Sequence, residues 1–248
     1  MELRRFRADL HIHSCLSPCG ELTNYPRRIV ERAVEEGLDI IAVTDHNTAE
    51  NAAAVVRAAE GTELTVLPGM ELTSEEEVHV LGVFGDLAGL RPVQDQVFRS
   101  LPDVPASKKT AENQVVVDEN DDVTGFSARP LLAATRMDVR EIVSLIHRFG
   151  GLAIASHIDK DAFSVISQLG FIPPGLDFDA LEVSPLMTAA AARTAFGLNP
   201  AIPLVRFSDA HRPEDIGRTS TDFLLAEPSL EEIRSALRSE KKRKICRS

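Results

Sequence analysis

The sequence has few of the residues on which aromatic or disulfide-based architectures depend. Its 248 residues include no tryptophan, one tyrosine and three cysteines. So few large aromatic rings argue against a platform for stacking the bases of single-stranded nucleic acid. Three cysteines do not make a disulfide framework. A disulfide between Cys15 and Cys19 is not expected in a reducing compartment.

Long apolar runs and an excess of positive charge are also missing. No run approaches about 18 apolar residues, and the N-terminus has no long apolar segment of the signal-peptide type. The formal net charge of −11 argues against non-specific nucleic-acid binding through a broad basic face. We therefore expect a cytoplasmic protein with no membrane partner and no stable nucleic-acid partner. A short nucleotide in a metal site is not excluded by the charge.

The pattern of apolar runs predicts an α/β fold. Helical periodicity occupies residues 25–37, 48–61, 138–151 and 228–240. Short apolar runs, most of them without polar alternation, indicate buried parallel strands that follow the opening run before His11: 39–46, 63–73, 78–84, 151–158, 180–185, 203–211 and 221–228. This alternation favours an α/β barrel over a flat sheet. The length suits one barrel domain spanning residues 1–248.

One segment, from residue 86 to about 136, interrupts this alternation. It contains a predicted β-hairpin around Glu119-Asn120-Asp121. Long ordered loops in compact domains are usually functional. We therefore interpret the segment as an inserted lid-like segment, with a structural decoration as the alternative.

Histidine is the residue type with the most informative distribution. Six of the seven histidines are placed at or beside the C-terminal part of a predicted strand or in the turn after it: His11, His13, His46, His79, His157 and His211. The seventh, His147, lies in a predicted helix and is given no role. In an α/β barrel the carboxyl ends of the strands form the active-site face. Alternate strand residues point the same way, which applies to His11 with His13 and to Asp209 with His211.

This concentration of imidazoles predicts a metal site. Imidazole is the commonest metal ligand in proteins. Together with the carboxylates of Glu71 and Asp209, the ligand set suits Zn, Mn or Fe. Eight candidate ligands exceed what one ion can bind, so we expect two or three divalent ions that share a bridging carboxylate.

Six motifs in this order resemble the PHP family (polymerase and histidinol phosphatase): "DLHIHS", "TDHN", "PGMELT", "HVLGV", "ASHID" and "SDAH". The resemblance implies a distorted (βα)7 barrel with two or three metals and a phosphoesterase activity. At the matching positions it implies these ligands: His11, His13 and Asp209 for a first metal, Glu71 as the bridge, His79 and His157 for a second metal, and His46 and His211 for a third.

The turn after the first motif departs from the family pattern. The family usually has Ser-Asp-Gly there, and that aspartate helps to bind the third metal. Here the residues are Ser17, Pro18, Cys19 and Gly20. Two interpretations stay open: a Cys19 thiolate replaces the aspartate as ligand, or Cys15 and Cys19 are small residues that shape a tight turn.

The predicted function is the hydrolysis of a phosphate ester by a metal-bridging hydroxide. The substrate would be a phosphomonoester or a small nucleotide or oligonucleotide phosphodiester. Glu71, Asp209 and His211 are the candidate catalytic residues, with His211 or His46 protonating the leaving oxygen. Lys160 and Arg129 are candidates for binding phosphate, with solvated side chains as the alternative for each.

Two other functions are considered. An amidohydrolase-like C–N hydrolase would be expected to have a carboxylated lysine at the bridge, where this chain has Glu71. A non-catalytic metal-binding module would be expected to have lost ligands, whereas this chain has the full set. Both features favour a metal-dependent phosphoesterase.

Overall fold

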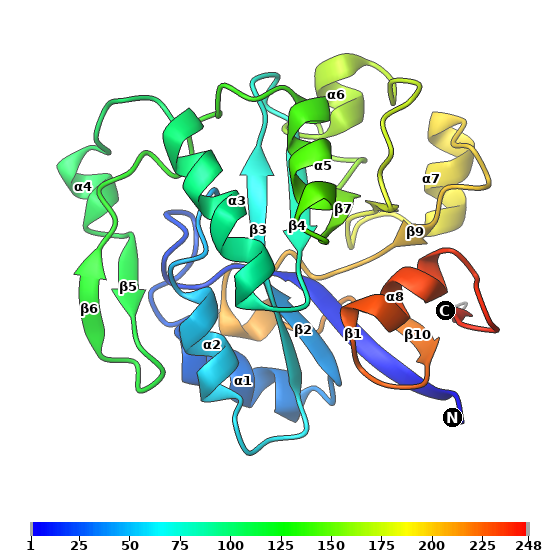
Figure 1. Cartoon of the computed structure of the whole chain (residues 1–248), viewed down its shortest axis with the longest axis horizontal. Helices are drawn as coiled ribbons and strands as arrows, with labels where there is room; N and C mark the ends of the chain where they lie inside the picture. Colours follow the sequence, from blue (N-terminus) through cyan, green and yellow to red (C-terminus); the bar gives the residue numbers. More distant parts are fainter. Residues whose placement is uncertain (1, 247–248) are drawn as a thin grey trace.

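Nine strands form one curled sheet in the computed structural model, which describes residues 2–246 (Figure 1). From one edge to the other the strands are β11 (Lys244–Ile245), β10 (Thr221–Leu225), β1 (Arg4–Ile12), β2 (Ile40–Val43), β3 (Thr65–Thr73), β4 (His79–Val83), β7 (Leu152–Ala155), β8 (Ala180–Glu182) and β9 (Leu204–Val205). The α/β class predicted from the sequence is confirmed, and each predicted strand is present, β9 in a form shortened to two residues.

The sheet mixes strand directions. β1, β2 and β3 are parallel, as are β7, β8 and β9. The prediction of parallel strands is wrong for β4, which is antiparallel to β3 and β7, and for β10, which is antiparallel to β1. The β3–β4 connection is only a short turn, and such a turn permits antiparallel pairing alone. A bridge between Ile12 and Ala210 joins the segment after β9 to the end of β1. The complete (βα)7 barrel stays a prediction.

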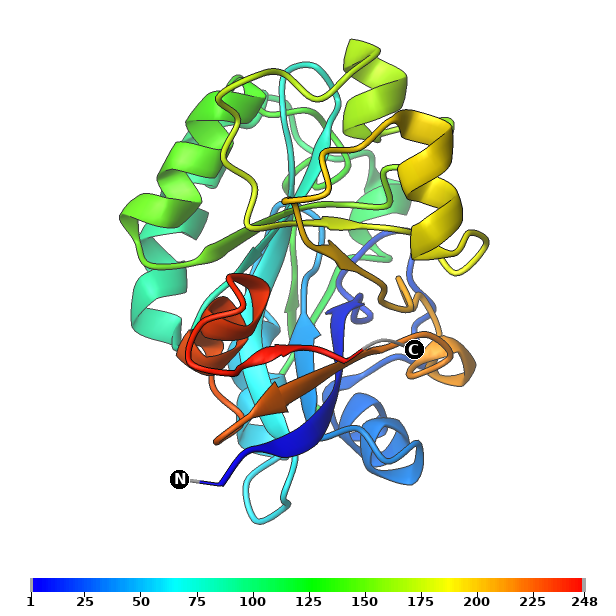
Figure 2. The ribbon, with the colours of Figure 1, turned by 90° about the vertical axis from the view of Figure 1, so that its right-hand side faces the viewer.

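Helices lie on both sides of the curled sheet (Figure 2). They are α1 (Pro26–Glu35), α2 (Ala52–Ala58), α3 (Leu87–Ser100), α4 (Lys108–Ala111), α5 (Val139–Arg148), α6 (Val165–Leu169), α7 (Ala189–Phe196), α8 (Leu230–Leu237) and a 3-10 turn (Pro213–Asp215). The four predicted helices correspond to α1, α2, α5 and α8. Within residues 2–246, no helix is long and apolar enough to cross a membrane.

The apolar core is divided by the sheet. α3 and α5 pack on β4 and β7 in one cluster, α1 and α2 pack on β2 in another, and α8 packs with β1 and β10 in a third. Because apolar side chains fill both sides of the strands, the polar side chains gather at the strand ends.

The segment from 86 to 136 has two structurally different parts. Its first part is α3, whose Leu90, Val93 and Val97 are buried in the core. Gly89 and Pro92 lie inside this helix and weaken its sequence signal. The second part contains α4 and the predicted hairpin, formed by β5 (Val115–Val117) and β6 (Val123–Phe126). The helix α3 is thus a core element, and a lid role for the remainder stays a prediction.

Candidate metal centre

The structure brings all eight predicted ligands together on the side of the sheet where β1, β2 and β3 end. They lie at or near the ends of six strands: His11 and His13 (β1), His46 (β2), Glu71 (β3), His79 (β4), His157 (β7), and Asp209 and His211 (β9). His79 is the first residue of β4, so its predicted place at the carboxyl part of a strand is wrong. Because β4 is antiparallel, its first residue reaches the same edge as the last residues of β3.

The carboxylate of Glu71 is at the middle of this centre. Its side chain is 1% exposed. Five imidazole nitrogens lie within 3.5 Å of its oxygens: His46 Nδ1 and His79 Nδ1 at 3.1 Å, His11 Nε2 and His157 Nε2 at 3.4 Å, and His13 Nε2 at 3.5 Å. Burial alone would raise the pKa of Glu71, but the facing imidazoles outweigh it and hold that pKa well below its ordinary value. Glu71 is therefore an anion.

Asp209 supplies the second buried carboxylate. Its Oδ1 lies 3.2 Å from His11 Nε2 and 3.3 Å from His13 Nε2, and its Oδ2 pairs with Lys160 Nζ. Burial acts to raise the pKa of Asp209, but His11 and His13 hold it well below its ordinary value. Burial acts to lower the pKa of Lys160, and Asp209 raises it above its ordinary value, so the ammonium stays charged.

The donor atoms of the centre fit divalent metal ions. Among the buried side-chain atoms that have no hydrogen-bond partner within residues 2–246, four belong to residues of the centre: Glu71 Oε1, His46 Nδ1, His79 Nδ1 and His157 Nδ1. Buried polar atoms without partners are unfavourable and rare. Three of them, Glu71 Oε1, His46 Nδ1 and His79 Nδ1, belong to one group of donors around the Glu71 carboxylate, which is the arrangement that a cation would satisfy. Imidazole and carboxylate donors suit Zn, Mn or Fe.

Three groups of donors have ligand atoms within 4.8 Å of one another: His11, His13 and Glu71; His46, Glu71 and His79; and His13, His46 and His211. Burial lowers the pKa of His13 to about 4 and that of His46 well below its ordinary value. These two imidazoles are therefore neutral at pH 7, which is the form that binds metals. In the part of the chain that is described, Cys19 belongs to none of the groups, although it lines the same cavity.

Glu182 is a residue of the centre that the sequence analysis missed. It is fully buried, and its Oε2 lies 2.9 Å from His11 Nδ1 and 3.2 Å from the backbone nitrogen of His157. The Glu182 carboxylate accepts the proton on His11 Nδ1, so Nε2 is the atom that faces Glu71 and Asp209 and would bind a metal. The sequence did contain a signal for Glu182, because it is the one charged residue in the apolar run "ALEVSP". A charged side chain in a buried strand needs a partner, which here is His11.

Hydrogen bonds fix the second histidine of the first motif as well. His13 Nδ1 lies 3.1 Å from Ser17 Oγ, and this hydroxyl donates to Asp45 Oδ1 at 2.6 Å. Asp45 also accepts from the backbone nitrogen of Ser14 at 2.7 Å. Ser17 thus positions His13 through Nδ1 instead of supplying a ligand. Asp9 has a local role, since it accepts from the backbone nitrogens of Ser208 and Gly217, both at 3.0 Å.

The centre opens into a cavity of about 790 Å³. Besides ligands of the centre, its lining includes Cys19, Leu132, Lys160, Phe163, Leu186 and Met187. Lys160 is thus in place to contact a substrate. Arg129, the other predicted phosphate-binding residue, is absent from this lining, and its guanidinium packs on the ring of Phe98 at 4.0 Å.

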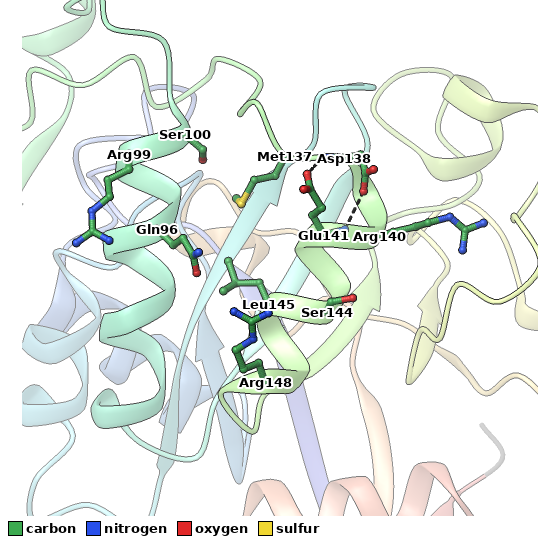
Figure 3. A pocket seen from close by; sticks show the side chains of 10 residues that line it. All are labelled: Gln96, Arg99, Ser100, Met137, Asp138, Arg140, Glu141, Ser144, Leu145 and Arg148. Atoms are coloured by element: carbon green, nitrogen blue, oxygen red, sulfur yellow. Dashed lines mark hydrogen bonds between the residues drawn. The ribbon is translucent and has the colours of Figure 1, made fainter.

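A second cavity, of about 540 Å³, lies between α3 and α5 (Figure 3). Its lining includes none of the eight ligands. The carboxylates of Asp138 and Glu141 that border it are already used, because each accepts a hydrogen bond from the other's backbone nitrogen at the start of α5. The chemistry of the molecule is therefore expected in the first cavity.

Comparison with known proteins assigns the family. The PHP domain family matches residues 9–182, which is more than half of the chain, and the PHP-associated family matches residues 202–241. The chain belongs to the PHP family. The resemblance noted from the six motifs is thereby confirmed, and the chain is placed in a family of metal-dependent hydrolases, as the sequence predicted.

Individual relatives either align with only a part of this chain or have a low sequence identity to it. The 5'-3' exoribonuclease Rnm of Salmonella typhimurium is 38% identical over 88 residues, which are 32% of this chain and 28% of that protein. The match thus covers less than a third of that relative's length. Endonuclease Q of Pyrococcus furiosus has a similar fold, with a TM-score of 0.71 and 20% identity over 98% of this chain and 58% of that one. An amidohydrolase of Chromobacterium violaceum gives a TM-score of 0.55 and 22% identity over 85% of this chain and 89% of that one.

Proposed function

We propose that this PHP protein hydrolyses a phosphate ester, either a phosphomonoester or a small nucleotide or oligonucleotide phosphodiester. The observation that carries the proposal is the Glu71 carboxylate, which has five imidazoles within 3.5 Å. A buried carboxylate among several imidazole nitrogens is the arrangement of a bridging metal ligand. The names of two similar proteins, an exoribonuclease and an endonuclease, support phosphate-ester chemistry.

Two or three divalent ions would be held by the eight side chains of the centre, with Glu71 shared between the first two. His11, His13 and Asp209 would complete the first site, His79 and His157 the second, and His46 and His211 the third, beside His13. When bound, the ions would supply a water nucleophile of lowered pKa and neutralise charge on the phosphate.

Other side chains of the cavity would bind the substrate and move protons. Lys160, charged beside Asp209, would bind a phosphate oxygen. The His211 ring donates from Nδ1 to the carbonyl oxygen of Asp209 at 2.8 Å, so Nε2 is its free atom. With two ions bound and none on His211, Nε2 of the protonated ring would pass a proton to the leaving oxygen, whereas with a third ion bound Nε2 would be the ligand. Glu182 would keep His11 in the Nδ1–H form throughout.

The partner we propose is a small phosphorylated substrate or the end of an oligonucleotide. The net charge of −11 argues against a stable complex with a long nucleic acid. A cavity of about 790 Å³ has the size of one for a drug- or nucleotide-sized ligand.

A phosphate-release screen tests this proposal. Protein loaded with Mn²⁺ and protein treated with EDTA are compared on sugar phosphates, nucleoside phosphates and short 5'-phosphorylated oligonucleotides. We expect release of phosphate or of mononucleotide that depends on the metal. Release of ammonia from amide substrates without any phosphate-ester cleavage would favour the C–N hydrolase instead. Full metal loading without turnover of either class would favour a binding module.

A further inference from the structure

We propose that the cavity contains a nucleobase subsite formed by the ring of Phe163, so that the substrate is a nucleoside phosphate or a terminal nucleotide. The inference rests on the proposed phosphate-ester hydrolysis, because it concerns the organic part of that substrate. It is carried by the position of this ring, by its backbone conformation and by the apolar residues beside it.

One loop, residues 157–164, supplies three different groups to the cavity. His157 contributes to the metal centre, Lys160 pairs with Asp209, and Phe163 lines the cavity. One hydrogen bond, from Ser164 Oγ to the carbonyl of Lys160 at 2.8 Å, joins the two ends of this part of the loop. The ring of Phe163 is thereby fixed relative to the charged end of the cavity.

The ring of Phe163 stacks on an imidazole of the centre. The centroids of Phe163 and His79 are 4.6 Å apart, and the ring planes differ by 16°. The backbone nitrogen of His79 also donates to the carbonyl of Phe163 at 2.9 Å. Although one face of the ring is covered in this way, Phe163 is 40% exposed. The base of a nucleotide can therefore stack on the ring of Phe163 while the phosphate of the same nucleotide lies beside the metal ligands.

The backbone at Phe163 is unfavourable for the residue it carries. Its φ is +60°, in the left-handed region that a bulky side chain rarely adopts. Glycine or asparagine would occupy this conformation at lower cost. Strained residues of this kind gather at functional sites, and His157 and Asp209 of the same centre also have positive φ values, of 27° and 51°. A strained position that keeps a large aromatic ring indicates that the ring itself has a use.

Other apolar side chains line the cavity, together with the polar Asp159, Asp161 and Ser184. Leu132 is 50% exposed and Leu186 is 94% exposed, and both line the cavity. Exposed apolar groups that gather at a cavity mark a binding surface. The cavity thus has a charged end at Lys160 and Asp209 and an apolar end at Phe163 and the two leucines. A nucleoside phosphate has the matching chemistry, because a flat, largely apolar base is attached to a phosphate through a ribose.

The aromatic content limits the subsite to one base. Apart from histidines, Phe163 is the one aromatic residue among those that line this cavity. A track for several bases of a single strand uses successive aromatic rings. We therefore expect recognition of one base, either in a mononucleotide or at the end of a short strand.

The test compares a substrate that has a base with one that lacks it. Hydrolysis of AMP and of ribose 5-phosphate by the Mn²⁺-loaded protein gives a ratio of kcat/KM values for each variant. Phe163→Ala and Phe163→Leu remove the ring, and Phe163→Tyr keeps it. Phe171→Ala is the matched control, since Phe171 is 60% exposed and lines a different cavity. Elemental analysis confirms equal metal content in all variants.

We expect the AMP to ribose 5-phosphate ratio to fall about tenfold or more in Phe163→Ala and Phe163→Leu, as for the loss of one base–aromatic stack. The ratio should be retained in Phe163→Tyr and in Phe171→Ala. An unchanged ratio, or equal losses on both substrates, would overturn the subsite.

Failure of the proposed function is distinguished by the wild type, which would then hydrolyse neither ester. In that case calorimetric titration of the metal-loaded protein decides the subsite. AMP should bind more tightly than ribose 5-phosphate to the wild type but not to Phe163→Leu, and equal affinities in the wild type would reject it. A 5'-phosphorylated dinucleotide in the same titration distinguishes a mononucleotide from a strand end.

Discussion

At the scale of single residues, the centre depends on the contrast between one anion and the imidazoles around it. Glu71 is ionised in a buried position, while burial keeps His13 and His46 neutral. Without a cation, such a set leaves polar atoms unsatisfied, among them Glu71 Oε1 and His79 Nδ1. These side chains therefore fit bound metal ions at this point.

Replacing Glu71 by Gln keeps the side-chain volume and removes the negative charge. We expect the metal content to fall by at least one equivalent per chain, and kcat to fall more than tenfold, about 1.4 kcal/mol in activation free energy. Elemental analysis and phosphate release measure both, with circular dichroism to check the fold. Glu60→Gln is the control, since Glu60 is exposed on the surface. Full metal content with kcat within tenfold of wild type would show that Glu71 is not the bridge.

Glu182 acts on the metals through His11. Glu182→Gln keeps a hydrogen-bond acceptor for His11 Nδ1 but removes the negative charge, so His11 becomes a weaker metal ligand. We expect the affinity for Mn²⁺, measured by calorimetry, to fall about 10–100-fold, as for other partners that orient a metal-ligating histidine. An affinity equal to that of Glu60→Gln would contradict this role.

Cys19 provides a test of the third site. Because His13, His46 and His211 form a donor group without it, we expect Cys19→Ser to keep the metal content of the wild type. A loss of about one equivalent that is recovered in Cys19→Asp would instead identify the thiol as the replacement for the family's aspartate.

The eight predicted ligands could be selected from the sequence because histidine and carboxylate side chains are rare in apolar strands, and the structure brings these residues together. Glu182, Ser17 and Phe163 could not be assigned in the same way. Their roles depend on which strands and loops become neighbours, and that is a property of the folded sheet. The packing of Arg129 on Phe98 was equally inaccessible, since a lone arginine carries no information about which surface its guanidinium contacts.

At the scale of elements, a histidine outside the centre has a clear structural role. His147 on α5 lies with Nε2 2.9 Å from Asp179 Oδ2, and this carboxylate also accepts from the backbone nitrogen of Ala153 at 2.9 Å. Asp179 thus joins α5 to β7. Burial acts to raise the pKa of Asp179, but these hydrogen bonds hold it below its ordinary value of 3.8.

The sign of this shift predicts a pH dependence of stability. A carboxyl with a lowered pKa in the folded state stabilises the fold above pH 3.8 and loses that contribution as the pH falls through its folded pKa. We expect Asp179→Asn to lower the free energy of unfolding by about 1–3 kcal/mol at pH 7. The difference from wild type should shrink below about pH 4 in urea titrations. The exposed Asp177→Asn is the control, and a difference that grows on acidification would contradict the argument.

Elements with strong periodicity were predictable and those with interrupted patterns were not. The α5 sequence combines a capping box at Asp138 and Glu141 with an apolar stripe, and its prediction is confirmed. The helix α3 contains Gly89 and Pro92, which conceal an equally buried stripe. Strand direction was missed at β4 because an apolar run has the same appearance in a parallel and in an antiparallel pair.

At the scale of the whole molecule, both family-matched segments contribute to one sheet. β8 lies in the first segment and β9 and β10 in the second, and all three belong to the nine-stranded sheet. We therefore propose that residues 1–248 form one domain.

A lid role for the segment after α3 needs a test that leaves the core intact. Replacing residues 90–130 by a linker would remove Leu90, Val93 and Val97 from the core, so this deletion would change the fold together with any lid.

The hairpin β5–β6 is attached to the turn that follows the first histidines. The side chain of Asn51 accepts from the backbone nitrogen of Val117 at 3.0 Å, and donates to the carbonyl of Val115 and to Ser14 Oγ, both at 3.1 Å. All three contacts are buried. A lid that opens in each turnover would have to break these contacts, whereas a fixed hairpin would keep them.

Asn51→Ala removes this attachment and leaves its partners unsatisfied. We expect the free energy of unfolding to fall by about 1–3 kcal/mol, and the amide of Val117 to exchange with solvent faster than in wild type. Asn120→Ala, in the exposed turn of the hairpin, should leave both quantities unchanged. If the Val117 amide already exchanges rapidly in wild type, the contact opens readily and the hairpin is a mobile lid. Slow exchange that is lost in Asn51→Ala would identify the hairpin as a fixed part of the fold.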